Sequence, residues 1–428
     1  MNDMHTCYIH ALRSELITAL GCTEPIAIAY AAAKAGEVLG RFPERMEIRC
    51  SGNIIKNVKS VEIPHSHGLR GVEAAAVLGV VGGKSELELE VLSTVTPEDV
   101  EKAKSLLAAD FITCKLQHGV SNLYIVASVY AAGHEAHVTV INRHINISCI
   151  ELDGRIIYRQ QEEETSLPTA TDHKDDWSIR SIIDFADTVD IDEIKDLLQS
   201  QLDKNTAIAV HGLSNAYGGQ VGRILLESYG NTVRTRARAK AAAGSDARMG
   251  GCSLPVVINS GSGNQGMTVS LPVAEYAREM NVSQEKLYRS LLVSNLVSIY
   301  QKHFIGNLSA FCGAVTAAAG AGAGITYLHC GTYEQICHTI INTVANVGGI
   351  ICDGAKASCA AKIASAVDAA ILGHEMSMRG LYFHSGDGIV GEDIEETIRS
   401  AGYIGKVGMR DTDAVVLDVM MGNAPVGK

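Results

Sequence analysis

The second half of the chain most strongly constrains the fold. From about residue 206 to residue 428, apolar residues recur at helical spacing, and alanine and glycine are abundant. Gly-Gly pairs and Gly-Ser turns separate the helical stretches, and small side chains let neighbouring helices approach closely. We therefore predict an all-helical domain over 206–428, with a buried site that helix ends surround.

Residues 45–150 follow a different pattern, in which apolar and polar residues alternate as they do in half-buried strands. A smaller mixed α+β domain is predicted here, with helices at 71–81 and 97–109. Its strands are expected at 46–51, 58–63, 86–95, 123–131 and 136–148. The acidic and polar residues 151–205 predict a solvated connection with a short helix near 191–198. The fold class predicted for the whole chain is therefore α+β.

The N-terminal part, residues 1–44, is predicted to hold two helices, at 7–20 and 23–39. Thr23 is a natural N-cap for the second helix, and Gly40 ends it. We expect these N-terminal helices to pack on the helical domain that follows later in the chain.

Composition excludes several classes of function. The formal net charge of -12 argues against binding to nucleic acid or to anionic membranes, because both favour basic patches. Only 5% of the residues are aromatic, which leaves few platforms for base stacking. Leu308–Leu328 carries no charge and is long enough to span a bilayer. Its alanine and glycine content instead predicts a buried helix of a soluble domain.

Three of the 11 cysteines stand out by their context. The chain starts with a polar stretch rather than an export signal, so we expect a cytoplasmic protein with reduced thiols. Cys312, Cys352 and Cys359 lie beside glycine-rich turns and small residues. Three thiolates around an iron–sulfur cluster would leave one iron open to act as a Lewis acid. No C-x-x-C spacing supports this, so a zinc site or three small buried hydrophobes stay open as alternatives.

Two further segments could carry chemistry. Cys22 directly precedes a predicted helix, where a thiol is expected to have a lowered pKa suited to a base or a nucleophile. The alternative is an inert thiol in a loop. The glycine-rich segment 259–272 is interpreted as a loop whose N–H groups bind a substrate carboxylate, with Asn264 and Gln265 pointing inward. The alternative interpretation of this segment, a tight structural turn between helices, has equal support.

Other polar residues give weaker signals. His65 and His67 could bind a metal or line a pocket, but a polar loop is the simpler interpretation. His211 has no partner visible in the sequence. Lys356 lies three residues before Cys359, where it could pair with a carboxylate or with cluster charge.

Taken together, these motifs resemble those of the iron–sulfur L-cysteine desulfidases, relatives of the α chain of iron–sulfur-dependent L-serine dehydratases. The shared motifs are G-C-T-E-P, G-S-G-N-Q-G-M-T-V-S-L-P, F-C-G-A and I-C-D-G-A-K-x-S-C, in this order along essentially the whole chain.

The resemblance implies a [4Fe–4S] cluster held by three cysteines, Cys312, Cys352 and Cys359. It also implies that Cys22 is the base that removes the substrate's α-proton. The reaction would be a β-elimination from L-cysteine, without pyridoxal phosphate (PLP), that yields sulfide, ammonia and pyruvate. The substrate-binding residues that we expect are Glu24, Asn264, Gln265 and Lys356.

Two alternatives accompany this hypothesis. The first is dehydration of L-serine to pyruvate and ammonia, and the second is a non-catalytic iron–sulfur or small-molecule sensor. In either enzyme the partner is a small amino acid, with no nucleic acid and no membrane involved. A homo-oligomer is expected because most soluble enzymes of this size form one.

Overall fold

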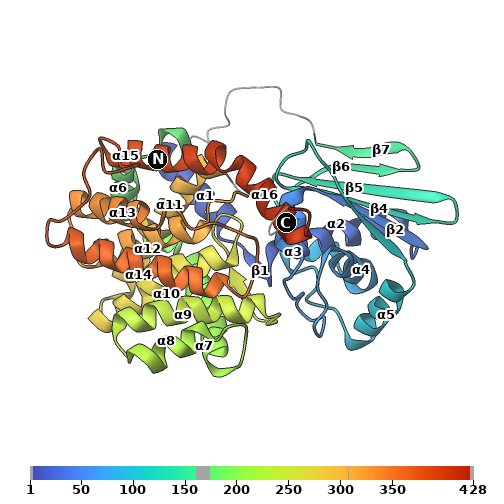
Figure 1. Ribbon diagram of the computed structural model, residues 1–428, viewed down its shortest axis with the longest axis horizontal. Helices are drawn as coiled ribbons and strands as arrows, with labels where there is room; N and C mark the ends of the chain where they lie inside the picture. The colour runs from blue at the N-terminus through green and yellow to red at the C-terminus, as the bar shows by residue number, and fades with distance from the viewer. Residues whose placement is uncertain (1–2, 161–173, 307, 425–428) are drawn as a thin grey trace.

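The computed structural model describes residues 3–160, 174–306 and 308–424 and divides them into a helical body and a mixed body that lie side by side (Figure 1). Each body has its own large apolar core. The predicted combination of a helical domain and a smaller mixed domain is therefore confirmed.

A six-stranded sheet forms one layer of the mixed body, in the order β3-β2-β4-β5-β6-β7. β2 and β3 are parallel, whereas all the other neighbours are antiparallel. Side chains of β5 alternate between buried and more exposed positions, so only one face of this strand enters the core. The strands span Arg45–Cys50 (β2), Ile112–Leu116 (β3), Tyr124–Ala131 (β4), His134–Ile141 (β5), Ile147–Leu152 (β6) and Arg155–Arg159 (β7).

Helices cover the buried face of this sheet. α2 packs against β4 and β5, and α4 packs against α2. These helices are rich in alanine, valine and isoleucine, and both bury most of their length. The helical segments of the mixed body are α2 (Thr23–Leu39), α3 (Gly52–Val58), α4 (Val72–Gly82), the 3₁₀ segment η1 (Ser85–Glu90) and α5 (Pro97–Ala108).

Two predicted strands of the mixed body are wrong. Residues 58–63 follow α3 as a turn with a single bridge, from Glu62 to Arg70. Residues 86–95 form η1 and turns, with Leu89 buried and Leu87 exposed. Turns rather than strands therefore bury Val61 and Ile63 in the first segment and Val91 and Leu92 in the second.

The helical body is built around α12 (Gly313–Leu328), which packs on α10, α11, α13 and α14. Close approach there depends on small residues, since a Cβ on Gly320 would lie 2.4 Å from the carbonyl oxygen of Ser294. The surrounding helices are α7 (Lys195–Ser214), α8 (Val221–Tyr229), α9 (Val233–Met249), α10 (Gly263–Met280), α11 (Gln284–Ile305), α13 (Tyr333–Val347), α14 (Cys359–Ser377) and α15 (Ile394–Tyr403).

The prediction of a buried helix within 308–328 is confirmed, with its start at Gly313 rather than at Leu308. Nearly every residue of α12 is buried among protein side chains. None of the helices in the described parts of the chain has the length and apolar character needed to cross a membrane.

The N-terminal part is shared between the two bodies. α1 (Asp3–Glu15) contributes to the core of the helical body, whereas α2 packs in the core of the mixed body. Between them, β1 (Thr18–Leu20) pairs with β8 (Pro255–Val257) of the helical body. This pairing fixes the start of α2 at the junction of the two bodies.

The segment 151–205 is more ordered than a solvated connection. Its first residues complete β6 and form β7, and residues 161–173 lie outside the described residues. Two helices follow, α6 (Ile179–Thr188) and the beginning of α7, joined by the short 3₁₀ turn η3 (Ile191–Glu193). α6 has a strongly apolar face that enters the core, a pattern that its polar neighbours obscured in the sequence.

The C-terminal segment returns to the mixed body. After α15, the π-helical turn η4 (Ile404–Gly408) leads into α16 (Arg410–Met421), which packs on α3 (Figure 1). The side chain of Asp413 in α16 lies 2.5 Å from the ammonium of Lys56 in α3, and this buried ion pair ties the two bodies together.

Candidate active site

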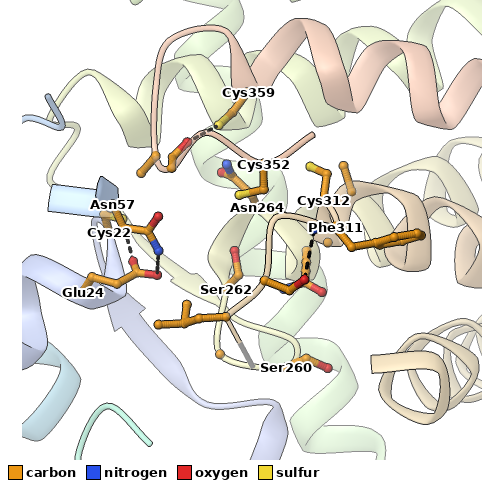
Figure 2. A pocket seen from close by; sticks show the side chains of 18 of the residues that line it. Cys22, Glu24, Asn57, Ser260, Ser262, Asn264, Phe311, Cys312, Cys352 and Cys359 are labelled. Atoms are coloured by element: carbon orange, nitrogen blue, oxygen red, sulfur yellow. Dashed lines mark hydrogen bonds between the residues drawn. The ribbon is translucent and has the colours of Figure 1, made fainter. Parts of the chain in front are cut away.

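One pocket, with a cavity volume of about 100 Å³, lies where the two bodies meet. Four helices begin at its wall, namely α2, α10, α12 and α14 (Figure 2). In the described structure none of these four helix starts is capped by a side-chain hydrogen bond. Free N–H groups and helix dipoles therefore make this pocket suited to negatively charged ligands.

The predicted metal ligands Cys312, Cys352 and Cys359 all line this pocket. Cys312 is the residue before α12, and Cys359 is the first residue of α14. Cys352 lies in the loop between α13 and α14. Backbone hydrogen bonds hold its segment to that of Cys312, including 2.7 Å from the Cys352 N–H to the carbonyl oxygen of Ala310.

The thiols of Cys312 and Cys352 are in contact. A hydrogen bond from the Cys312 thiol, together with the positive charges of Lys56 and Lys302, lowers the pKa of Cys352. The same hydrogen bond and burial raise the pKa of Cys312. Burial also raises the pKa of Cys359, to about 11. Cys352 is therefore the thiol of this set that is most readily deprotonated.

Within the described residues, no three Cys, His, Asp or Glu side chains are arranged as they stand to hold a metal ion. An iron–sulfur cluster distributes its thiolate ligands over several iron atoms and does not need them around one point.

Two buried lysines lie at this part of the pocket. Lys56 and Lys302 line the pocket, and both are at most 5% exposed. Lys302 carries positive charge close to Cys312 and Cys352, although burial lowers its pKa. The predicted substrate-binding residue Lys356 does not line the pocket. Its Nζ donates to the backbone carbonyl of Lys56 at 3.1 Å.

Cys22 lies at the same pocket, on the side of the mixed body (Figure 2). Gly21, at φ 60°, turns the chain after β1, and Cys22 becomes the N-cap of α2 in place of the predicted Thr23. The Cys22 thiol donates to Oε2 of Glu24 at 3.0 Å, and Asn57 donates to Oε1 at 2.9 Å.

The predicted lowering of the Cys22 pKa is wrong. Burial and the negative charge of Glu24 raise the pKa of this thiol well above its usual value, although Arg248 opposes the shift. Burial disfavours ionisation of Glu24, but His144, the Cys22 thiol and Arg248 outweigh it and hold the pKa of Glu24 well below its usual range. The effects of the neighbouring carboxylate and of burial exceed that of the helix dipole.

The glycine-rich segment 259–272 differs from the predicted loop. Only its first residues form a tight turn, and α10 starts at Gly263 and includes the rest. Asn264 and Gln265 both line the pocket from the first turn of this helix, as the sequence analysis predicted. Backbone N–H groups are presented by a helix start rather than by an open loop.

The pocket residues that the sequence analysis missed include Arg248, His144 and Asn57. Each has a buried side-chain atom that, in the described structure, lacks a hydrogen-bond partner. The available signal for Arg248 was its position as a single basic residue after the alanine-rich stretch of α9. No local pattern marks the other two, because their positions depend on contacts between the bodies.

The remaining histidines lie outside the lining of this pocket. His65 and His67 both have positive φ in a turn, in agreement with the polar-loop interpretation. His211 contacts the hydroxyl of Tyr217 through Nε2, at 3.0 Å.

Comparison with known proteins identifies the family of this chain. A family model described as the serine dehydratase alpha chain matches residues 86–418, which include all three pocket cysteines of the helical body. A UPF0597 protein of Lachnoclostridium phytofermentans is 52% identical over 418 residues, which cover 98% of this chain and 100% of the relative. A UPF0597 protein of Desulfitobacterium hafniense is 50% identical over 414 residues, which cover 97% and 96%. Because the family match spans well over half of the sequence, the chain belongs to the serine dehydratase α-chain family.

Proposed function

We propose that this protein is an iron–sulfur-dependent lyase that eliminates the thiol of L-cysteine without pyridoxal phosphate and yields sulfide, ammonia and pyruvate. One observation carries the proposal: Cys22 and the three cysteines Cys312, Cys352 and Cys359 line the same buried pocket, where four helices begin. These residues come from opposite ends of the chain and from both bodies.

Cys312, Cys352 and Cys359 would hold a [4Fe–4S] cluster. The buried ammonium groups of Lys56 and Lys302 would balance its negative charge. When bound, such a cluster supplies a Lewis acid that stabilises the negative charge developing on the β-substituent. The helix starts of α12 and α14 add N–H groups at the same place.

Cys22 would act as the base. Its thiolate would take the α-proton, the electrons of the Cα–H bond would form the Cα–Cβ double bond, and the Cβ–S bond would break with its electrons moving to sulfur. Water then converts the aminoacrylate product to pyruvate and ammonia. A raised pKa makes Cys22 a stronger base once its proton has passed to solvent, and the hydrogen bond to Glu24 holds the Cys22 side chain in place at the pocket.

L-Serine is the second candidate substrate, because the matching family model is described as a serine dehydratase. The same residues would act, with hydroxide in place of sulfide as the leaving group. A cytoplasmic location, where thiols are kept reduced, is part of the proposal. The proposal also includes that the protein forms a homo-oligomer and that it binds a small amino acid.

The test is anaerobic reconstitution of the purified protein with iron and sulfide, followed by measurement of iron content, visible absorption and product formation. We expect bound iron, sulfide released from L-cysteine, and loss of both when Cys312, Cys352 or Cys359 is replaced by serine. Cys330→Ser is the matched control, because Cys330 is exposed and does not line the pocket. Wild-type protein that binds a full cluster yet releases neither sulfide from L-cysteine nor pyruvate from L-serine would contradict the proposal and favour a sensor.

A further inference from the structure

Arg248 is a buried cation with one unused donor. It lies one residue before the end of α9 and is only 1% exposed. Its Nε donates to the carbonyl oxygen of Gly21 at 2.8 Å, and its Nη1 donates to Oδ1 of Asn264 at 3.2 Å. In the described structure its Nη2 is buried without any hydrogen-bond partner. Leaving such a group unsatisfied is costly, so its presence at a pocket points to a ligand.

The surroundings of Arg248 favour an anion. The guanidinium lies against the start of α10, where a Cβ on Gly263 would be 2.5 Å from Nε of Arg248. Glycine at this position therefore allows the arginine to approach the free N–H groups of the first helical turn. An arginine beside a helix start offers charge and several donors directed at one place.

Among the described residues, no ion pair joins Arg248 to an acidic side chain. Its charge acts on the nearby Glu24, but the two oxygens of that carboxylate accept hydrogen bonds from Cys22 and Asn57 rather than from Arg248. The other pocket cations have different surroundings. Lys56 is paired with Asp413, and Lys302 lies close to Cys312 and Cys352. Arg248 is thus the pocket cation that forms no ion pair within the described residues and lies adjacent to Cys22.

We propose that Arg248 binds the α-carboxylate of the substrate and restricts the enzyme to amino acids in which this group is free. The proposal rests on the proposed function, since it takes the ligand to be an α-amino acid. Nη2 would donate to one carboxylate oxygen, and the first turn of α10 would donate to the other. Asn264 acts as a positioning residue that orients the guanidinium through Nη1.

The experiment compares binding of L-alanine and L-alaninamide to the reconstituted holoenzyme by calorimetry under anaerobic conditions. Alanine has no β-leaving group, so binding is measured without turnover. The two ligands differ only in the carboxylate. We expect the wild-type protein to prefer L-alanine by about 10- to 100-fold, the range for hydrogen bonds to a charged group. Arg248→Lys and Arg248→Gln should reduce this preference to less than about threefold, because neither retains the forked donor.

Matched variants keep the test informative. Arg238→Lys, on the same helix but outside the pocket, should retain the full preference. Asn264→Ala should weaken it several-fold and serves as a second test if the Arg248 variants fold poorly. Equal binding of acid and amide by the wild-type protein would overturn the proposal. A preference lost in Lys302→Gln but kept in Arg248→Lys would overturn it as well. Failure of the proposed reaction appears separately, as an absence of turnover with L-cysteine and L-serine.

Discussion

The thiol of Cys22 donates a hydrogen bond of 3.0 Å to the carboxylate of Glu24, only two residues further along the chain. Both side chains are buried at the start of α2, and Asn57 of α3 holds the other carboxylate oxygen in place. The proposed base and the carboxylate that orients it are therefore joined in one unit before any substrate binds. The unit lies across the pocket from the three cysteines of the helical body (Figure 2).

Replacing Cys22 by serine should abolish turnover without removing the cluster. A serine hydroxyl can still donate to Glu24, so the fold is retained. However, a hydroxyl ionises far less readily than a thiol, so the basic form needed to take the α-proton is not available. We expect a fall of about 10²- to 10⁴-fold in kcat, the range for loss of a general base. Cys337→Ser is the control, because Cys337 is also buried but belongs to the core of the helical body. Unchanged turnover with full iron content would rule out Cys22 as the base.

Glu24→Gln should shift the pH dependence of catalysis. The negative charge of Glu24 contributes to the raised pKa of Cys22, so removing it lowers that pKa. Wild-type kcat/KM should rise with pH as Cys22 ionises, and the midpoint of this rise should move down by about one pH unit in the variant. The profile of kcat/KM from neutral pH up to the highest pH at which the protein stays folded checks this. A midpoint that stays in place or moves up would show that another group controls the reaction.

The second helix illustrates what could be predicted from the sequence. The helix predicted at 23–39 has the limits of α2, and Gly40, which was expected to end it, has a φ of 72°. The strand predicted at 86–95 was wrong because alternation alone does not distinguish a strand from a series of turns. Its side chains gain their burial from the packing of η1 against α2, which no local pattern records.

The candidate site likewise contains some residues that the sequence could identify and others that it could not. The cysteines could be selected because their glycine-rich surroundings are unusual within the sequence itself. Arg248, His144 and Asn57 reach the pocket from α9, from the turn between β5 and β6, and from α3. Their significance depends on how the two bodies meet, and the unsatisfied atoms that identify them exist only in three dimensions. The direction of the Cys22 pKa shift was likewise hidden, because burial is a tertiary property.

Asp413→Asn should destabilise the junction of the two bodies. Asp413 forms a buried ion pair with Lys56 and also accepts a hydrogen bond from the N–H of Ala310, close to Cys312. Asparagine can still accept from this N–H but leaves the Lys56 charge unpaired. We expect the free energy of unfolding to fall by about 3–5 kcal/mol, as found when one partner of a buried pair is removed. Urea denaturation measures this change.

The control for this experiment is the exposed pair between Lys104 and Glu101 on α5. Glu101→Gln should change the free energy of unfolding by less than about 1 kcal/mol, because water already screens this pair. Equal effects of the two substitutions would mean that the contact between α16 and α3 contributes little to the stability of the protein.

His374 should make the helical body sensitive to acid. Its imidazole is buried on α14, with Nδ1 2.9 Å from the hydroxyl of Thr326, and burial and the neighbouring His329 lower its pKa to about 4. An unfolded chain takes up this proton near pH 6.5, so between about pH 6.5 and pH 4 the unfolded state binds more protons than the folded state. Stability is therefore complete above this window and decreases as the pH falls through it, by up to about 3 kcal/mol from this one group.

Replacing His374 by glutamine removes the titrating group while keeping a side chain that can bond to Thr326. Urea unfolding at pH 7, 6 and 5 should show a shallower loss of stability in this variant than in the wild-type protein. His10→Gln, at an exposed position on α1, should leave the slope unchanged. The same slope in the wild-type protein and His374→Gln would assign the acid sensitivity to other groups, because only a proton bound differently by the two states can produce it.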